Sequence, residues 1–487
     1  MEFSMRYVLL RLLLFGLLFS LLRFTFFVTI QDNSCNTKGF CFISPNNHNF
    51  RVQTGSSAVS VISSSSRTLH DLWTSKEWRK TVNFYSSVFM DLMGEGYIGM
   101  ESKVLCVETV TGEDVFALKE IGVRDVIGVS KKAKPPLVRS AKRFDGGSFD
   151  VVFSGGGGLE RRPFEVAAEI EKMVKIGGFV VVVLTKSGKD DYSYISFLEL
   201  FTFCRVVKSR DIDDGFREII MRKEAKLFVD GHSNEENGNE CSVRMHKQDL
   251  VRNAEPLIVE EPLKPWLTLK INIKNVKYLP SMADISFKRK YVYVDVGARS
   301  YGSSIGSWFK KHYPKQNKTF EIYAIEADKT FHEEYRTKKG VNLLPYAAWL
   351  RNETLFFEIN RDPGQLVSNK GRGMGRIQPV QTGTAFLGDA DKIKGFDFAN
   401  WLKNTVSERD FVVMKMDVEG TEFDLIPRLF ETGAICLIDE VFLECHYNRW
   451  QRCCPGERSP KYQKTYNQCL ELFSSLRKSG VLVHQWW

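Results

Sequence analysis

The chain has 487 residues, 43% of them hydrophobic and 26% charged, and these ordinary globular values exclude a disordered or collagen-like protein. Because a single hydrophobic core stops growing at roughly 250 to 300 residues, the length predicts two folded domains. The net charge of +9 would suit an anionic partner, but the basic stretch 131–143 accompanies no zinc-finger or RNA-binding signature, so no nucleic-acid partner is expected.

The N-terminal segment has the sequence pattern of a membrane-spanning helix. Residues 7–30 form an almost unbroken apolar run, with Arg6 and Arg11 at its N-terminal end. The run is long enough to span a bilayer, and the positive-inside rule places the short N-terminus in the cytosol. A cleaved signal peptide is the alternative, but the run exceeds a usual h-region and no A-x-A-like site follows it. We therefore predict a cytosolic N-terminus and signal-anchor transmembrane helix over residues 1–30 and a serine-rich stem over 31–71.

This topology predicts a single-pass type II membrane protein of the secretory pathway, placed in the Golgi, with its folded part in the lumen. There the ten cysteines can pair, and the N-x-S/T sites at Asn317 and Asn352 can be glycosylated. The connectivity stays open, and buried free thiols are the alternative. The cysteines placed to form bridges are Cys35, Cys41, Cys445, Cys453, Cys454 and Cys469.

Residues 72–229 predict a first α/β domain, since the apolar runs KVLCVETV, DVIGVS, FDVVFS and GFVVVVL alternate with helical segments. The glycine run at 155–158 lacks the Walker lysine and hydroxyl and predicts an irregular loop. With SFDVVFS and KIGGFVVVVL, the domain resembles class I S-adenosylmethionine-dependent methyltransferases.

The cofactor loop of this first domain departs from that family. Cys106 and Ser130 stand where the family has acids, and Glu108 and Val110 stand where it has glycines. Side chains at the two glycine positions would crowd the approach of the backbone to a ligand. We therefore interpret the domain as a degenerate relative with a structural or partner-binding role.

After a polar linker over 230–265, residues 266–487 predict a second α/β domain with a doubly wound sheet. Its strands are expected in YVYVDVG, FEIYAIEAD, VNLLPYAAW, DFVVMKMDVEG, CLIDEVFLECHY and VLVHQWW, with LFFEIN as a hairpin partner of VNLLPYAAW. Ligands of such sheets bind beyond the carboxyl ends of the strands. The polar residues and glycine at these ends are Asp295, Gly297, Glu326, Asp417, Glu419, Glu444 and His446.

The turn after the first of these strands indicates which of two classes of cofactor the domain can bind. Arg299 stands where a dinucleotide site needs its second glycine, which argues against NAD. A glycine turn followed by an acid at the end of the next strand suits S-adenosylmethionine, whose ribose hydroxyls need a carboxylate.

The motifs VDVGARSYG, YAIEAD, MKMDVEGTE and FLECHY resemble those of FkbM-type methyltransferases, and the likeness covers about two hundred residues. The two-domain arrangement behind an anchor is similar to a plant group of membrane-anchored proteins. The resemblance implies methyl transfer from S-adenosylmethionine to a hydroxyl oxygen of a sugar or small molecule. It implies cofactor binding by Asp295, Gly297, Gly302 and Glu326.

For the removal of the hydroxyl proton, His446 is the first candidate because its ordinary pKa lies near working pH, and Asp417 is the second. Together with Glu419 they form the predicted catalytic set. Each also has a structural interpretation, as a helix cap, a residue favouring a helix N-terminus or a hydrogen-bonded core histidine. The three side chains could hold a divalent cation, but no metal-specific spacing is present, so no metal is predicted.

Two further alternatives stay open. The glycine-rich, basic insertion 360–383 is either a lid over the acceptor or a flexible surface loop. The rival of the enzyme hypothesis is a membrane-tethered scaffold in which both domains bind partners and neither is catalytic.

Overall fold

The computed structural model describes residues 75–130, 137–138, 144–185, 191–213, 215–225, 245–359, 375–378, 391–451 and 456–486. The predicted anchor and stem, as well as Cys35, Cys41, Cys453 and Cys454, lie outside these residues. Every helix within the described part is too short or too polar to span a bilayer.

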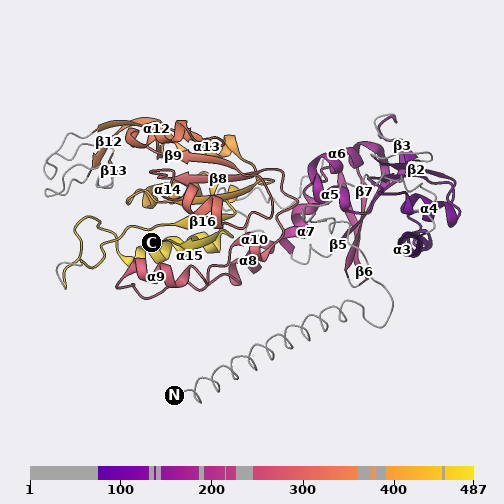
Figure 1. The fold of residues 1–487 in the computed structure, drawn as a ribbon, viewed down its shortest axis with the longest axis horizontal. Helices are drawn as coiled ribbons and strands as arrows, with labels where there is room; N and C mark the ends of the chain where they lie inside the picture. Colours follow the sequence, from indigo (N-terminus) through magenta and orange to yellow (C-terminus); the bar gives the residue numbers. More distant parts are fainter. Residues whose placement is uncertain are drawn as a thin grey trace, which may run out of the picture. The chain divides into compact units, whose positions relative to one another are not determined.

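The first domain is a sheet with the strand order β3-β2-β1-β4-β5-β7-β6, surrounded by helices (Figure 1). Only β7 runs antiparallel to its neighbours. The chain turns back between β1 and β4, so the sheet is doubly wound. Its strands are β1 (Lys103–Val107), β2 (Asp125–Val129), β3 (Leu137–Val138), β4 (Phe149–Ser154), β5 (Val174–Thr185), β6 (Cys204–Asp213) and β7 (Phe216–Lys223). Its helices are α3 (Lys76–Gly94), α4 (Glu113–Glu120), α5 (Gly157–Arg161), α6 (Pro163–Met173) and α7 (Asp191–Leu198).

The strands expected in the first domain are confirmed, but the prediction of an irregular loop at 155–158 is wrong in part. Helix α5 begins inside the glycine run, at Gly157. Gly156 makes the turn into this helix with a φ of +85°, where a Cβ would lie 2.5 Å from the Val183 carbonyl oxygen. The glycine is therefore needed for a tight turn between strand and helix.

The second domain has a six-stranded, fully parallel sheet in the order β10-β9-β8-β15-β16-β17. The order reverses between β8 and β15, which makes this pair of strands the topological switch point. The predicted α/β class, with two Rossmann-like sheets in series, is confirmed. The strands are β8 (Tyr291–Val296), β9 (Glu321–Ile325), β10 (Asn342–Leu344), β15 (Phe411–Met416), β16 (Glu440–Leu443) and β17 (Leu482–Gln485).

Helices and helical turns cover both faces of this sheet. Helices α13, α14 and α15 pack on one face, whereas α8, α10, η3 and α12 pack on the other. The elements are α8 (Met245–Arg252), α9 (Pro265–Asn272), α10 (Leu279–Met282), the π-helix η3 (Ile305–Phe309), α11 (Lys310–His312), the 3-10 helices η4 (Lys329–Phe331) and η5 (Ala434–Leu437), α12 (His332–Arg336), α13 (Phe398–Thr405), α14 (Glu422–Glu431) and α15 (Tyr466–Lys478). Helix α8 lies within the segment predicted as a polar linker, 230–265.

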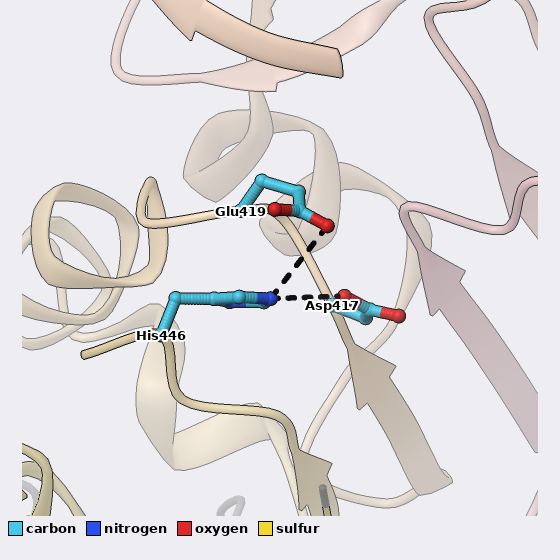
Figure 2. Close-up of side chains that lie close together, drawn as sticks. All are labelled: Asp417, Glu419 and His446. Atoms are coloured by element: carbon cyan, nitrogen blue, oxygen red, sulfur yellow. Dashed lines mark ion pairs between the residues drawn. The ribbon is translucent and has the colours of Figure 1, made fainter. Parts of the chain in front are cut away.

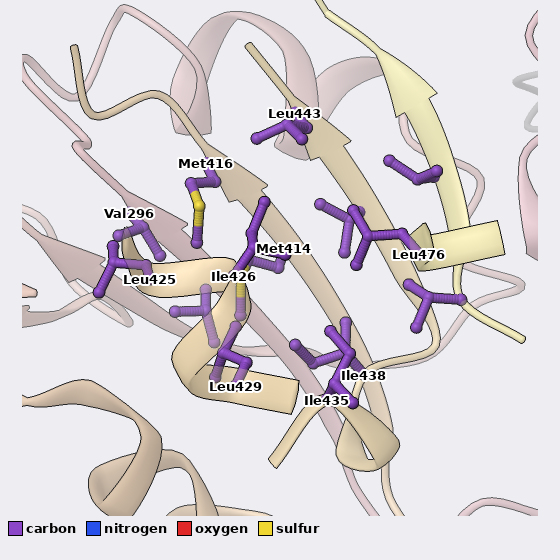
Figure 3. Close-up of a cluster of buried hydrophobic side chains, with 14 of the residues drawn as sticks. Val296, Met414, Met416, Leu425, Ile426, Leu429, Ile435, Ile438, Leu443 and Leu476 are labelled. Carbon is purple, nitrogen blue, oxygen red and sulfur yellow. The ribbon is translucent and has the colours of Figure 1, made fainter. Parts of the chain in front are cut away.

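The core shows why β15 and α14 hold their positions. All six residues of β15 are buried, as expected for a central strand of a parallel sheet. Helix α14 directs Leu425, Ile426 and Leu429 toward Met414 and Met416 of this strand (Figure 3). Their spacing places them on one helix face, so burial of that face fixes the helix directly after the strand.

A small second sheet, in the order β11-β14-β12-β13, is inserted after β10. The predicted hairpin between VNLLPYAAW and LFFEIN is wrong, because β11 pairs with β14 in parallel while β12 pairs with β13 and β14. Part of the predicted insertion 360–383 is the strand β13, and its other residues lie outside the described part. The strands are β11 (Ala347–Trp349), β12 (Glu353–Ile359), β13 (Gly375–Gln378) and β14 (Asp391–Asp397).

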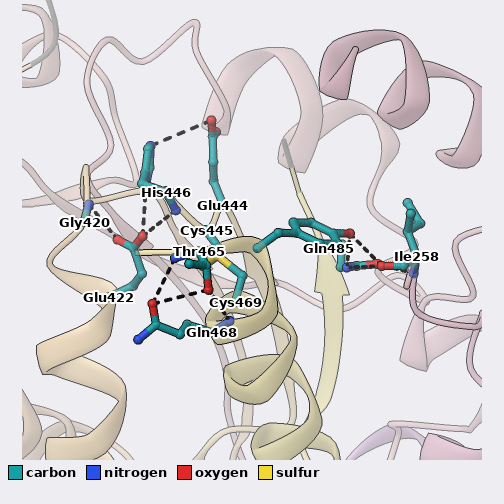
Figure 4. The surroundings of a disulfide bond; sticks show 11 residues. Ile258, Gly420, Glu422, Glu444, Cys445, His446, Thr465, Gln468, Cys469 and Gln485 are labelled. Carbon is teal, nitrogen blue, oxygen red and sulfur yellow. Dashed lines mark hydrogen bonds and ion pairs between the residues drawn. A yellow bond between two sulfur atoms is a disulfide. The ribbon is translucent and has the colours of Figure 1, made fainter. Parts of the chain in front are cut away.

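A disulfide between Cys445 and Cys469 connects the segment after β16 to α15 (Figure 4). Both cysteines were among the predicted bridge formers, and Cys436 is also disulfide-bonded. Cys106 and Cys204 are buried free thiols. The bridge anchors the backbone next to His446, one of the predicted catalytic residues.

Candidate active site

The predicted site residues follow four neighbouring strands. Glu326 follows β9, Gly297 follows β8, Asp417 follows β15, and His446 comes shortly after β16. Because these strands are parallel and adjacent, their carboxyl ends meet at one edge of the sheet, at the switch point. A pocket of about 110 Å³ opens there. Its lining includes Gly297, Arg299, Glu326, Asp328, Phe331, Tyr346, Ile377, Asp417 and Glu419.

The turn after β8 depends on glycine at one of its two predicted positions. Gly297 has a φ of +81°, and a Cβ there would lie 1.9 Å from the Asp417 carbonyl oxygen. The loops after β8 and β15 therefore approach each other where no side chain fits. At Gly302 a Cβ would meet no atom within 4 Å, so space alone does not require glycine there.

Asp295 lies beneath this turn rather than in the pocket lining. Its Oδ2 atom accepts hydrogen bonds from the hydroxyls of Ser304 and Tyr293, whereas no described residue forms a hydrogen bond with Oδ1. Burial raises the pKa of Asp295. Through its hydrogen bond with Ser304, the carboxyl group of Asp295 stabilises the loop after β8. Its contact with a cofactor stays a prediction.

Glu326 lines the pocket with a carboxylate held by backbone donors. The backbone N–H groups of Arg299 and Asp328 donate to its two oxygens, each over 2.6 Å. Burial raises the pKa of Glu326 to about 7. Each oxygen accepts one of these bonds and has a second lone pair left for a ligand hydroxyl. Arg299, an unusual residue for this loop, adopts a φ of +51°, and in this conformation its backbone N–H donates to Glu326.

The buried side chain of His446 is the centre of a cluster of charged side chains (Figure 2). Its Nε2 atom lies 3.6 Å from Asp417 Oδ1, 3.8 Å from Glu419 Oε1 and 3.9 Å from Glu444 Oε1. On the other side of the ring, Nδ1 lies 3.2 Å from Glu422 Oε1 (Figure 4). Burial alone would lower the pKa of His446, but Glu422, Glu419 and Asp417 raise it to about 9.

The pKa of His446 weakens the argument that made it the first candidate for the base, because at neutral pH the ring carries its proton. His446 also lies outside the pocket lining, and only 2% of its side chain is exposed. Asp417 lines the pocket and is 29% exposed. Burial opposes its ionisation, but Lys415 and His446 hold the pKa of Asp417 below its usual range.

Three further residues of this cluster lie in the sequence motifs or at the strand ends named above, but no role was predicted for them. Lys415 and Glu422 flank the predicted catalytic acids within KMDVEGTE, and Glu444 directly follows β16. Lys415 lies 3.4 Å from Asp417 Oδ2. Burial and then Asp417 raise the pKa of Glu444 to about 7. The signal for these residues was their position within one short motif and at one strand end, since buried charges are rarely unpaired.

In the first domain, the corresponding turn is filled by a side chain. Glu108 follows β1 with a φ of +54°, forms an ion pair with Arg162 and lies against Gly158, where a Cβ would be 2.3 Å from Glu108 Oε2. The expected crowding by Glu108 therefore agrees with the structure. Val110 is 65% exposed, and its expected crowding of a ligand stays a prediction.

Comparisons with known proteins concern the second domain and the fold. A family described as "Domain of unknown function (DUF7870)" matches residues 251–355 and 375–487. No curated protein matches the chain. A protein from Pyrococcus horikoshii OT3 has a similar structure with 13% identity and a TM-score of 0.26, over 31% of this chain and 93% of that chain. A 1,6-didemethyltoxoflavin-N1-methyltransferase from Burkholderia thailandensis, solved with S-adenosylhomocysteine, has 14% identity and a TM-score of 0.25 over 32% and 82%.

Proposed function

We propose that the second domain is an S-adenosylmethionine-dependent methyltransferase that acts on a hydroxyl oxygen. The observation that carries the proposal is the pocket at the switch point. There a glycine that tolerates no side chain, Gly297, lies beside Glu326 and Asp417. The motifs that resemble FkbM-type methyltransferases supply these same residues.

The residues of the pocket suit this cofactor. Glu326 offers both carboxylate oxygens to a pair of neighbouring hydroxyls, as a ribose presents them. Its pKa of about 7 would fall when hydroxyls donate to the carboxylate, so binding would favour the ionised form. The volume of about 110 Å³ is below the ~300 Å³ at which most ligand pockets begin, so the pocket would enclose only part of the cofactor.

The cofactor would supply an electrophilic methyl group, and the protein would align the acceptor and take up its proton. We assign the proton to Asp417 rather than to His446, because Asp417 lines the pocket. In this arrangement His446 is a positioning residue that, with Lys415, keeps Asp417 ionised.

The placement and the acceptor class belong to the same proposal. The apolar run 7–30 and the exposed Asn317 support a membrane-anchored protein whose domains lie in the secretory lumen, in the Golgi. A sugar or another hydroxyl compound would then be the acceptor. The alternative, a tethered scaffold, has one specific support, since Glu108 fills the turn of the first domain.

Calorimetric titration of S-adenosylmethionine into the purified full-length chain tests the proposal. We expect saturable binding that Glu326→Ala abolishes, because the carboxylate for the ribose is lost. Glu333→Ala is the matched control, since Glu333 is an exposed acid of α12 whose one ion pair among the described residues is with Arg336. Folded protein that binds no cofactor at millimolar concentration would refute the enzyme proposal and favour the scaffold.

A further inference from the structure

We propose that Asp417, Glu419 and His446 form a binding site for one divalent cation. One ligand atom from each residue lies within 4.8 Å of the other two. Ligand atoms bound at 2.0–2.2 Å to a common ion are separated by roughly 3 to 4.4 Å, depending on geometry. The observed distances from Nε2 to the two carboxylates, 3.6 and 3.8 Å, lie within this interval. The two carboxylate oxygens lie within 4.8 Å of each other, so an ion bound to all three side chains requires them to approach by at most about 0.4 Å.

The imidazole of His446 is held as a ligand would be. The ring is 2% exposed, and Nδ1 lies within hydrogen-bond distance of Glu422, whose side chain is fully buried. No hydrogen bond from a described residue reaches Nε2, although it points toward Asp417 and Glu419 (Figure 2). Histidines that bind metals almost always engage their other nitrogen in this way, often with a carboxylate.

The two carboxylates are oriented in the same manner. Asp417 directs Oδ2 toward Lys415 at 3.4 Å and leaves Oδ1 facing His446. Glu419 accepts hydrogen bonds at Oε2 from Lys461, over 2.6 Å, and from Tyr462, and leaves Oε1 facing His446. Each acid thus has one oxygen fixed by a donor and one directed toward the same point. Such outer partners orient the ligands of metal sites.

A second buried histidine, His484, shows that a histidine near two acids does not by itself leave a nitrogen available to an ion. His484 also lies between two acids, but Nδ1 lies 2.5 Å from Glu255 and Nε2 lies 2.8 Å from Glu440. Both of its nitrogens are at hydrogen-bond distance from a carboxylate, so neither is available to an ion. The His446 cluster differs because its facing atoms are too far apart for hydrogen bonds and close enough for a shared ion.

The ligand set indicates the kind of ion. One imidazole nitrogen and two carboxylate oxygens suit Mn²⁺ or Zn²⁺ better than Ca²⁺ or Mg²⁺, which prefer oxygen ligands alone. Asp417 and Glu419 also line the pocket, so the remaining coordination positions would face the acceptor. Binding of the ion would displace the proton from Nε2 of His446 to solvent. The ion would there bind the acceptor's hydroxyl oxygen, whose proton would pass to Oδ2 of Asp417, the oxygen that is not a ligand. This role rests on the proposed function, whereas the binding site itself does not.

The test is a titration of the full-length chain, freed of metal with EDTA, with Mn²⁺ followed by electron paramagnetic resonance. We expect one site, with affinity lowered at least ~10-fold by Asp417→Asn and by His446→Gln. His312→Gln is the matched control, because His312 is an exposed histidine of α11. Pulsed measurements on the unmodified chain should detect coupling to one imidazole nitrogen, a readout that does not depend on the folding of the variants.

The site is refuted if neither Mn²⁺ nor Zn²⁺ binds saturably at millimolar concentration, or if bound Mn²⁺ shows no nitrogen coupling. Titration of S-adenosylmethionine into the same preparation separates this failure from that of the proposed function. Cofactor binding without Mn²⁺ binding would overturn the metal site alone. Mn²⁺ binding with nitrogen coupling but without cofactor binding would support the metal site and overturn the methyltransferase proposal.

Discussion

Replacement of Gly297 by alanine should disrupt the edge of the second sheet on which the proposed site is built. A residue other than glycine at a φ of +81° costs about 1 to 2 kcal/mol. The added Cβ would also lie 1.9 Å from the Asp417 carbonyl oxygen, which is backbone and follows directly on β15. To relieve this contact, the loop after β15 must move, and with it Asp417 and Glu419. We therefore expect Gly297→Ala to lower the free energy of unfolding by more than about 3 kcal/mol, within the range of the most severe point mutations.

The measurement is urea unfolding of the full-length chain, followed by cofactor titration where the variant still folds. Gly302→Ala is a matched control in the same turn, because a Cβ there meets no atom within 4 Å and the backbone φ is not positive. We expect this control to change stability by less than about 0.5 kcal/mol. If both variants were equally stable and bound cofactor equally well, the close approach of the two loops would not exist and the argument for the pocket would be wrong.

Three further predictions concern stability and placement. Burial opposes the protonation of His484, but Glu255 and Glu440 raise its pKa from 6.5 to about 9. The protonated ring therefore contributes about 3 kcal/mol to the free energy of unfolding. This contribution is complete below pH 6.5 and is lost as the pH rises to 9. Urea unfolding should show this decline, and His484→Asn should diminish it. Cys469→Ala opens a bridge across 24 residues and should lower unfolding stability by about 3 kcal/mol, measured against the wild type in the absence and presence of reductant. Asn317 is exposed, so a chain made in the secretory pathway should lose mass on treatment with a glycosidase, and Asn317→Gln should reduce that loss.

The strands of both sheets and the convergence of the site were predictable, because each follows from a local pattern. The apolar run of β15 identifies a central parallel strand, and the acids after it must then lie at the edge used for ligands. The pairing of β11 with β14 was not predictable, since Ala347 is bonded across to a segment beginning more than forty residues later. Nothing local distinguishes that partner from the nearer β12. The same limit applies to Glu422, because its contact with His446 joins the first residue of α14 to the segment after β16, and only the fold brings these together.

The two domains have the same kind of turn after their first strand, but a side chain fills the space beside this turn in the first domain. In each sheet the residue directly after the first strand has a positive φ, Glu108 in one domain and Gly297 in the other. In the first domain Glu108 accepts this strain, and its side chain fills the space above Gly158 while Arg162 pairs with its charge. In the second domain the Asp417 carbonyl oxygen occupies the place where a side chain of residue 297 would begin, and the pocket lies beside this turn. Both first strands therefore end in a turn with a positive φ, and the turn beside the pocket is the one whose residue has no side chain.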